Sequence, residues 1–193
     1  MSQIGDLPRQ LVALPGSEKE AIAIAQIFNT KRLIGKQATE SVIEQLMLNA
    51  KIIHLATHGL LNELKETEVP GAIALAASQT DDGLLTSSEI LDLRLKTKLV
   101  VLSACHTGRG IITGGGVIGL SRSLMTASVA SVVVSLWSVP DAPTCLLMIE
   151  FDRQKQANPD KAHALGQAML TVRRNILTLA TGLHLFFYLN GKM

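Results

Sequence analysis

The chain has 193 residues, of which 47% are hydrophobic and 18% are charged, which is typical of one folded domain and not of a disordered protein. The net charge is only +2, and the chain holds one Trp and one Tyr, so nothing predicts the basic stripe and aromatic platforms of a nucleic-acid surface. No apolar run approaches the roughly 18 residues of a membrane span, and residues 1–8 lack the core of a signal peptide. We therefore predict a single cytoplasmic domain over 1–193, with 1–14 as a loose extension, that contacts neither nucleic acid nor membrane.

Along the chain, helical and extended patterns alternate. Apolar periodicity and start signals predict helices over residues 17–28, 39–49, 86–93 and 117–127, from 141 onward, and over 159–177. Apolar runs predict strands over residues 52–59, 71–77, 99–105, 131–136 and 183–189, with a short one at 31–34. This alternation predicts an α/β fold with a mainly parallel sheet and helices on both faces.

Three helix starts carry a capping signal. Ser17 with Glu20, and Thr86 with Glu89, both fit the pattern in which a hydroxyl and a carboxylate cap each other's backbone groups. Asp141 precedes a helical pattern whose first turn contains Pro143, so Asp141 is predicted to cap that helix.

The run from Leu99 to Cys105 is apolar apart from Ser103, and a polar, glycine-rich stretch over 106–116 follows it. Such a run is typical of a strand buried on both faces of a parallel sheet. Ligands and chemistry in these sheets lie at the carboxyl ends of the strands. The sequence therefore places the Cys105 thiol where an α/β protein would hold a nucleophile.

A nucleophilic thiol needs a base or a cationic neighbour, because its ordinary pKa is about 8.5. The strand predicted over 52–59 ends in His58 and Gly59. Two parallel strands end at the same edge of a sheet, and the 47 residues between positions 58 and 105 suffice for a crossover. We therefore predict that His58 and Cys105 form a catalytic dyad; a buried structural cysteine is the alternative.

Four segments, HLATHG, VVLSACHTG, GVIGLSRSLMTA and SVVVSLWSVPD, resemble the CHAT domain family over about residues 14–155. The resemblance implies a caspase-like fold, related to separases and caspases and often attached to tetratricopeptide repeats. It implies a cysteine endopeptidase that acts on a protein or peptide substrate and needs no metal and no organic cofactor. A tetratricopeptide-repeat region or partner protein is the implied binding partner.

The resemblance also assigns roles around the dyad. It implies that the N–H groups of Gly59 and Cys105 form an oxyanion hole, whereas Gly59 could instead be an ordinary turn glycine. Trp137 and Asp141 match the segment that builds the substrate pocket in separase-like relatives, where an aspartate receives a basic side chain. The alternatives are packing for Trp137 and helix capping for Asp141.

The five glycines at 108, 110, 114, 115 and 116 predict a loop that a partner or substrate must order, and hence a latent enzyme.

Other candidate sites are weaker. His54 lies inside a strand pattern and reads as a satisfied core histidine, and His106 is predicted to point away from its neighbour Cys105. A zinc site built from His54, His58, Cys105 and His106 is possible by ligand type, but the His54–His58 spacing suits a metal site on a helix, not on a strand. Residues 114–119 match G-x-G-x-x-G but start too far from the preceding strand for a dinucleotide fingerprint. Cys145 lies in a helical pattern as a small buried residue, which favours a reducing, intracellular setting over a disulfide.

Three departures from the family pattern support a second hypothesis, a protein-interaction or scaffold module without useful turnover. Ser128 stands where family members usually have glycine. The C-terminal aromatic segment is reduced to residues 184–189, and the repeats that usually recruit substrates are missing from the sequence.

Overall fold

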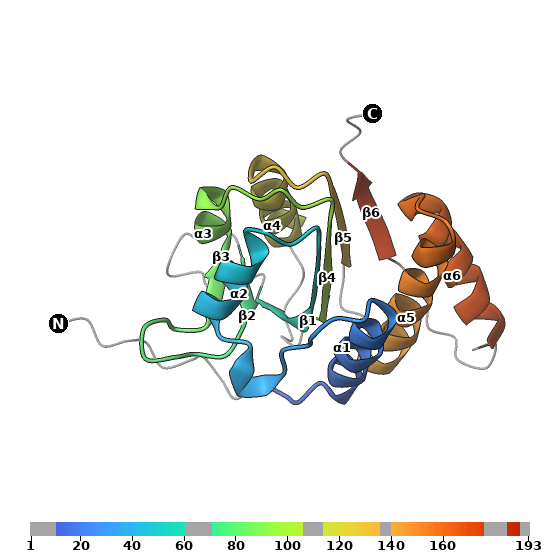
Figure 1. Cartoon of the computed structure of the whole chain (residues 1–193), viewed down its shortest axis with the longest axis horizontal. Helices are drawn as coiled ribbons and strands as arrows, with labels where there is room; N and C mark the ends of the chain where they lie inside the picture. Colours follow the sequence, from blue (N-terminus) through green and yellow to red (C-terminus); the bar gives the residue numbers. More distant parts are fainter. Residues whose placement is uncertain (1–10, 61–70, 106–113, 136–139, 176–184, 190–193) are drawn as a thin grey trace.

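The structure is a computed structural model, and it describes residues 11–60, 71–105, 114–135, 140–175 and 185–189. Within these ranges, six strands form one sheet in the order β3-β2-β1-β4-β5-β6 (Figure 1). The strands are β1 (Ile52–Leu60), β2 (Ala72–Ala74), β3 (Leu84–Thr86), β4 (Leu99–Cys105), β5 (Ser131–Ser135) and β6 (Leu185–Leu189). The middle strands β1, β4 and β5 run parallel, and β2, β3 and β6 add antiparallel edges. This arrangement confirms the predicted α/β, caspase-like fold.

Helices cover both faces of the sheet, as the sequence predicts. They are α1 (Pro15–Ile27), α2 (Glu40–Met47), α3 (Ser87–Asp92), α4 (Gly114–Thr126), α5 (Asp141–Ala157) and α6 (Lys161–Asn175), with a short 3-10 helix η1 (Gly35–Gln37). Helices α1, α5 and α6 lie together on one side of the molecule (Figure 1), and α2, α3 and α4 pack on the other face. No helix in the described ranges is long and apolar enough to cross a membrane.

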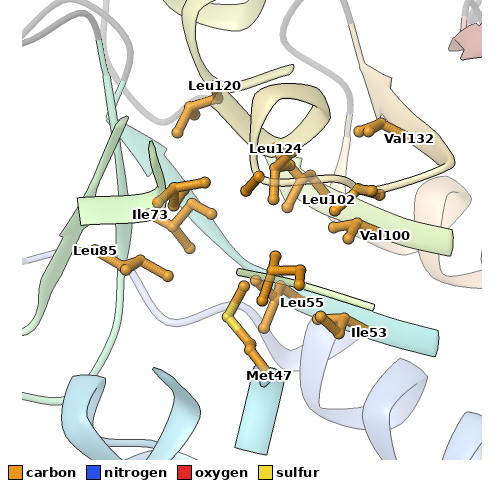
Figure 2. Packing of buried hydrophobic residues seen from close by; sticks show 14 of the residues in the cluster. Met47, Ile53, Leu55, Ile73, Leu85, Val100, Leu102, Leu120, Leu124 and Val132 are labelled. Carbon is orange, nitrogen blue, oxygen red and sulfur yellow. The ribbon is translucent and has the colours of Figure 1, made fainter. Parts of the chain in front are cut away.

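Strand β4 shows how the two faces are built. Its residues Val100 and Leu102 pack in the core under α2, α3 and α4, and Figure 2 shows them beside Leu124 of α4. Leu99 and Val101 pack in the other core, beneath α1, α5 and α6. Successive side chains of a strand point to opposite faces, so an uninterrupted apolar run is what a strand between two helical layers requires.

Several predicted elements have different bounds in the structure. Helix α1 begins at Pro15, not at Ser17, and α4 begins at Gly114, so three glycines assigned to the loop belong to a helix. Residues 31–34 do not form a strand. The three-residue strand β3 has no counterpart among the predicted elements, because Leu84–Thr86 is too short to show a period.

Ser128 has a left-handed backbone, with φ of 75°. The Ser128 N–H donates to Met125 O at 3.0 Å and the Val129 N–H to Leu124 O at 3.1 Å, a pair of bonds that ends a helix in the Schellman motif. Glycine is the usual residue at this position because it has no Cβ to clash. The family's preference for glycine at this position therefore has a backbone cause. Serine can adopt the left-handed conformation here only at some cost in backbone strain.

Candidate active site

The register between β1 and β4 determines the geometry of the candidate dyad. Residues 52–58 of β1 pair one to one with residues 99–105 of β4, and the last pair is His58 with Cys105. Cys105 is the last residue of β4, and His58 is the last residue of β1 that pairs with it, so both lie towards the carboxyl edge of the parallel strands, where ligands bind in α/β sheets. The backbone thus brings the two predicted dyad positions side by side, although the Cys105 side chain lies outside the described residues.

The imidazole of His58 is held by the chain that leads into α1. His58 is 7% exposed, and its Nε2 lies 2.8 Å from the carbonyl oxygen of Val12. A carbonyl oxygen only accepts hydrogen bonds, so Nε2 carries the proton and donates it. In the neutral ring, Nδ1 is then the basic nitrogen, because the partner of one nitrogen selects the tautomer of the ring.

Gly59, the implied oxyanion donor, lies inside β1 and not in a turn. The strand continues to Leu60, and its last two residues pair with β2, Gly59 with Ile73 and Leu60 with Ala72. Gly59 therefore follows His58 directly, where the pairing of β1 with β4 on one side ends and its pairing with β2 on the other side begins. Whether its N–H faces a substrate stays a prediction.

Trp137 lies outside the described residues, and Asp141 makes contacts that the sequence did not predict. Asp141 is the first residue of α5 and does not cap that helix, whose N-cap is Pro140. Its Oδ2 accepts a hydrogen bond from the Gly16 N–H at 2.6 Å. Its Oδ1 accepts from the Ser17 N–H at 2.9 Å and from the Ser17 Oγ at 3.1 Å. The carboxylate of Asp141 thus caps α1, not its own helix.

The start of α1 explains why it needs a cap from elsewhere in the fold. Its own N-cap residue is Leu14, which has no polar side chain, and Pro15 follows without an N–H. The N–H groups of the second and third helical residues, Gly16 and Ser17, are the ones that a cap normally accepts. Asp141 accepts both, and its negative charge also suits the positive end of the helix dipole.

Behind the dyad, four charged side chains form a buried charge cluster, defined here as Glu20, His54, Asp152 and Lys155. Because Ile53 and Leu55 face the core on the opposite side, His54 faces α1 and α5. Its Nε2 lies 2.6 Å from Glu20 Oε1 and its Nδ1 lies 3.4 Å from Asp152 Oδ2. Lys155 pairs with Asp152 on the same helix. His54 is thus a core histidine with charged partners, but it is not fully satisfied as predicted, because its Nδ1 and Asp152 Oδ2 have no hydrogen-bond partner among the described residues.

The protonation of this cluster follows from its contacts. Burial lowers the pKa of His54, but hydrogen bonding and the charges of Asp152 and Glu20 outweigh it and raise that pKa to about 9. Burial raises the pKa of Asp152, but His54 and Lys155 outweigh it and hold that pKa below its ordinary value. At neutral pH, the cluster holds two positive and two negative charges.

The sequence analysis missed three contributors to this region: Glu20, Asp152 and the Val12 carbonyl. A signal existed for the two acids, because Glu20 lies one turn from buried Ile24 and Asp152 one turn from buried Met148. A carboxylate within an apolar helical stripe needs a buried cation as partner. No side-chain pattern could have revealed the Val12 carbonyl, which is a backbone group.

The remaining candidates give no second site. His106 lies outside the described residues, and in the described ranges no group of three or more His, Cys, Asp or Glu side chains could hold a metal ion. Cys145 is a free cysteine, 5% exposed, and burial raises the pKa of its thiol, with the charges of Glu20 and Asp141 adding to the effect.

Comparison with known proteins agrees with the fold. Residues 6–178 match the family described as CHAT domain. The chain is 27% identical over 191 residues to tetratricopeptide repeat protein 28 of Mus musculus, an alignment that covers 83% of this chain and 8% of that protein. Tetratricopeptide repeat protein 28 of Homo sapiens gives the same identity and coverage. The chain therefore spans about a twelfth of the length of these relatives, and by its match to the family it belongs to the CHAT domain family.

Proposed function

We propose that the chain is a cysteine endopeptidase domain in which His58 is the base and Cys105 the nucleophile. The observation that carries this proposal is the register pair His58–Cys105 at the carboxyl ends of β1 and β4. The hydrogen bond from His58 Nε2 to Val12 O supports it, because it leaves Nδ1 as the basic nitrogen of the neutral ring.

The reaction follows from these two groups. His58 Nδ1 takes the thiol proton of Cys105, and the thiolate attacks the substrate carbonyl to form a carbon–sulfur bond. The carbon–nitrogen bond then breaks, and the leaving amine takes the proton from the imidazolium. Water attacks the acyl-enzyme while His58 takes its proton, the carbon–sulfur bond then breaks to release the acid, and the imidazolium returns the proton to the sulfur of Cys105. The N–H groups of Gly59 and Cys105 are the proposed donors to the oxyanion.

The test is a cleavage profile of the chain over a peptide library, read by mass spectrometry. Cys105→Ala should abolish cleavage at a stability cost on the order of 1 kcal/mol. His58→Ala should reduce the rate by about 10²- to 10⁴-fold, the usual contribution of a general base. Cys145→Ala is the matched control, because it removes the other thiol, which is buried in α5, and should leave the cleavage pattern unchanged. Cleavage that persists in Cys105→Ala would refute the mechanism.

The proposal includes latency and a repeat-containing partner. The relatives are named for tetratricopeptide repeats, and we propose that such a region recruits the substrate of this chain. Low activity is expected of the chain alone, because a glycine-rich sequence such as that of residues 106–116 has a high conformational entropy to lose when it is ordered. If no peptide is cleaved and Cys105 reacts with iodoacetamide no faster than Cys145, the interaction-module hypothesis is the better one.

A further inference from the structure

Helix α1 connects the capping carboxylate of Asp141 with the imidazole of His58. Val12, whose carbonyl accepts the hydrogen bond from His58, lies only four residues before Gly16, which Asp141 holds. Four residues span at most about 14 Å when fully extended, and Pro15, between them, has a fixed φ. The position of the Val12 carbonyl therefore depends on where the first turn of α1 is held.

Two carboxylates of α5 are linked to α1, which also packs on α5 through apolar residues. Asp141 caps its first turn through Gly16 and Ser17. One turn later, Glu20 contacts His54, which Asp152 also contacts. Asp141 and Asp152 are eleven residues apart, which is close to three helical turns, so they lie on the same face of α5. Removing the Asp152 contact would unbalance a buried charge cluster, whereas removing the Asp141 contact would release only the end of α1 that leads to Val12.

The approach of Asp141 to α1 is close enough to require glycine at position 16. A Cβ on Gly16 would lie 2.6 Å from both Cγ and Oδ2 of Asp141, nearer than side-chain atoms normally come. With no Cβ, the backbone of α1 can approach the carboxylate directly. Gly16 and Asp141 thus form one contact, and a substitution at either position should disrupt it.

We propose that Asp141 is a positioning residue for His58: by capping α1 it holds the Val12 carbonyl on Nε2 of the imidazole. This inference rests on the proposed dyad. It assigns Asp141 a role through the backbone of α1, in place of the salt bridge to a basic substrate side chain that the sequence suggested. The hydrogen bond to Val12 O holds the ring of His58 in place, so its loss should weaken the proposed pairing of the imidazole with the Cys105 thiol.

The test measures alkylation of Cys105 by iodoacetamide in the full chain from pH 5 to 9, with Cys145 as the internal reference. Thiolate is the reactive form, so the wild type should show a reactive shoulder at acid pH. Asp141→Ala should lower the rate at pH 6 by about tenfold and move the shoulder to higher pH, since one pKa unit is a tenfold change in thiolate. Gly16→Ala, which displaces the carboxylate without removing it, should change the profile in the same direction.

Two further variants separate the capping contact from general destabilisation. Asp141 accepts backbone N–H groups with both of its carboxylate oxygens, and Asn has only one acceptor oxygen, so Asp141→Asn should move the profile in the same direction as Asp141→Ala by a smaller step. Thr86→Ala removes the side-chain cap of α3, where Thr86 accepts from the Glu89 N–H, and should leave the profile unchanged. A Thr86→Ala profile that moves as far as that of Asp141→Ala would overturn the proposal, and so would an Asp141→Ala profile equal to that of the wild type.

His58→Ala distinguishes a failure of the proposed dyad from a failure of the positioning role of Asp141. If it removes the acid shoulder while Asp141→Ala and Gly16→Ala leave the shoulder in place, the dyad stands and the positioning role is wrong. If His58→Ala leaves the profile of Cys105 unchanged, the dyad itself is wrong, and the positioning role falls with it. Each rate is measured below the thermal unfolding midpoint of its variant. If Asp141→Ala does not fold, Asp141→Asn and Gly16→Ala decide the question.

Discussion

Two clusters of ionisable side chains lie on opposite faces of the sheet, and they differ in whether cations compensate their buried carboxylates. The buried charge cluster between α1, β1 and α5 combines Glu20 and Asp152 with His54 and Lys155. An acidic cluster between α2, α3 and the turn before β3 contains Glu40, Glu44, Asp81, Asp82 and Glu89, and the charges that act on Glu40 there are all carboxylates. Burial is similar for the central acids, since Asp152 is 1% exposed and Glu40 is 6% exposed.

The two clusters differ in what their carboxylates meet. Asp152 faces a protonated His54 and a lysine, so its pKa falls in spite of burial. Glu40 faces other acids, and burial together with Glu89, Asp82, Asp81 and Glu44 raises its pKa to about 7. Glu40 Oε2 and Asp152 Oδ2 both lack a hydrogen-bond partner among the described residues, so the two acids differ in the charges around them. A buried acid thus stabilises the fold where a cation compensates it and costs stability where none does.

Breaking the balanced cluster should have the largest effect. Asp152→Ala leaves His54 and Lys155 with only Glu20 to compensate them, and loss of one partner of a buried pair typically costs about 3–5 kcal/mol. Urea unfolding at pH 7 measures the change in the free energy of unfolding. Arg153→Ala on the same helix is the matched control. Arg153 is 63% exposed and lies 3.6 Å from Glu150, so its loss should cost less than about 1 kcal/mol.

A double variant separates charge imbalance from lost packing. Asp152→Ala combined with Lys155→Ala restores equal charge, so it should be less destabilising than Asp152→Ala alone, although Lys155 also lies 4.8 Å from the ring centre of Phe28. A double variant that loses more stability than the single one would show that packing, not charge balance, dominates this cluster.

The next effect concerns pH and His54. Its folded pKa is raised to about 9 from an ordinary value of 6.5, so its stabilising contribution is complete below pH 6.5 and is lost as the pH rises towards 9. The loss should amount to roughly 2–3 kcal/mol. It is measured as the difference in unfolding free energy between the wild type and His54→Gln across this range. An imidazole signal of His54 that titrates near pH 6.5 by NMR would contradict the prediction.

Much of the fold was predictable because the signals are local. Strand β4 was predicted at its observed bounds, since an apolar run between Lys98 and His106 indicates a buried strand in an α/β chain. The capping box at Thr86 and Glu89 is present as predicted. The same pattern at Ser17 and Glu20 was misread. There, Glu20 contacts His54 and Ser17 donates to Asp141, so partners more than thirty residues away replace the local bond.

The candidate site was predictable only in part. Parallel strand ends brought positions 58 and 105 together as expected, because register in a buried sheet follows from the apolar pattern. The Val12 carbonyl and the cap at Gly16 were not predictable, because they depend on how α1 lies against α5. The Asp141 carboxylate illustrates the limit: the sequence placed it at the start of a helix, and tertiary packing decided which helix it caps.

The smallest expected effect tests the unbalanced cluster. Glu40→Gln should raise the free energy of unfolding by about 1 kcal/mol at pH 8, because it removes an ionised carboxylate from a buried position surrounded by acids. The folded pKa of Glu40 is raised from 4.5 to about 7, so its cost is absent below pH 4.5, grows between these values and is complete above pH 7. The gain from Glu40→Gln should therefore be close to zero at pH 4. Glu18→Gln removes the same charge from an exposed position in the first turn of α1 and should give no gain at either pH. Equal gains at pH 4 and pH 8, measured by urea unfolding, would show that the substitution acts through packing and that the carboxylates around Glu40 do not destabilise the fold.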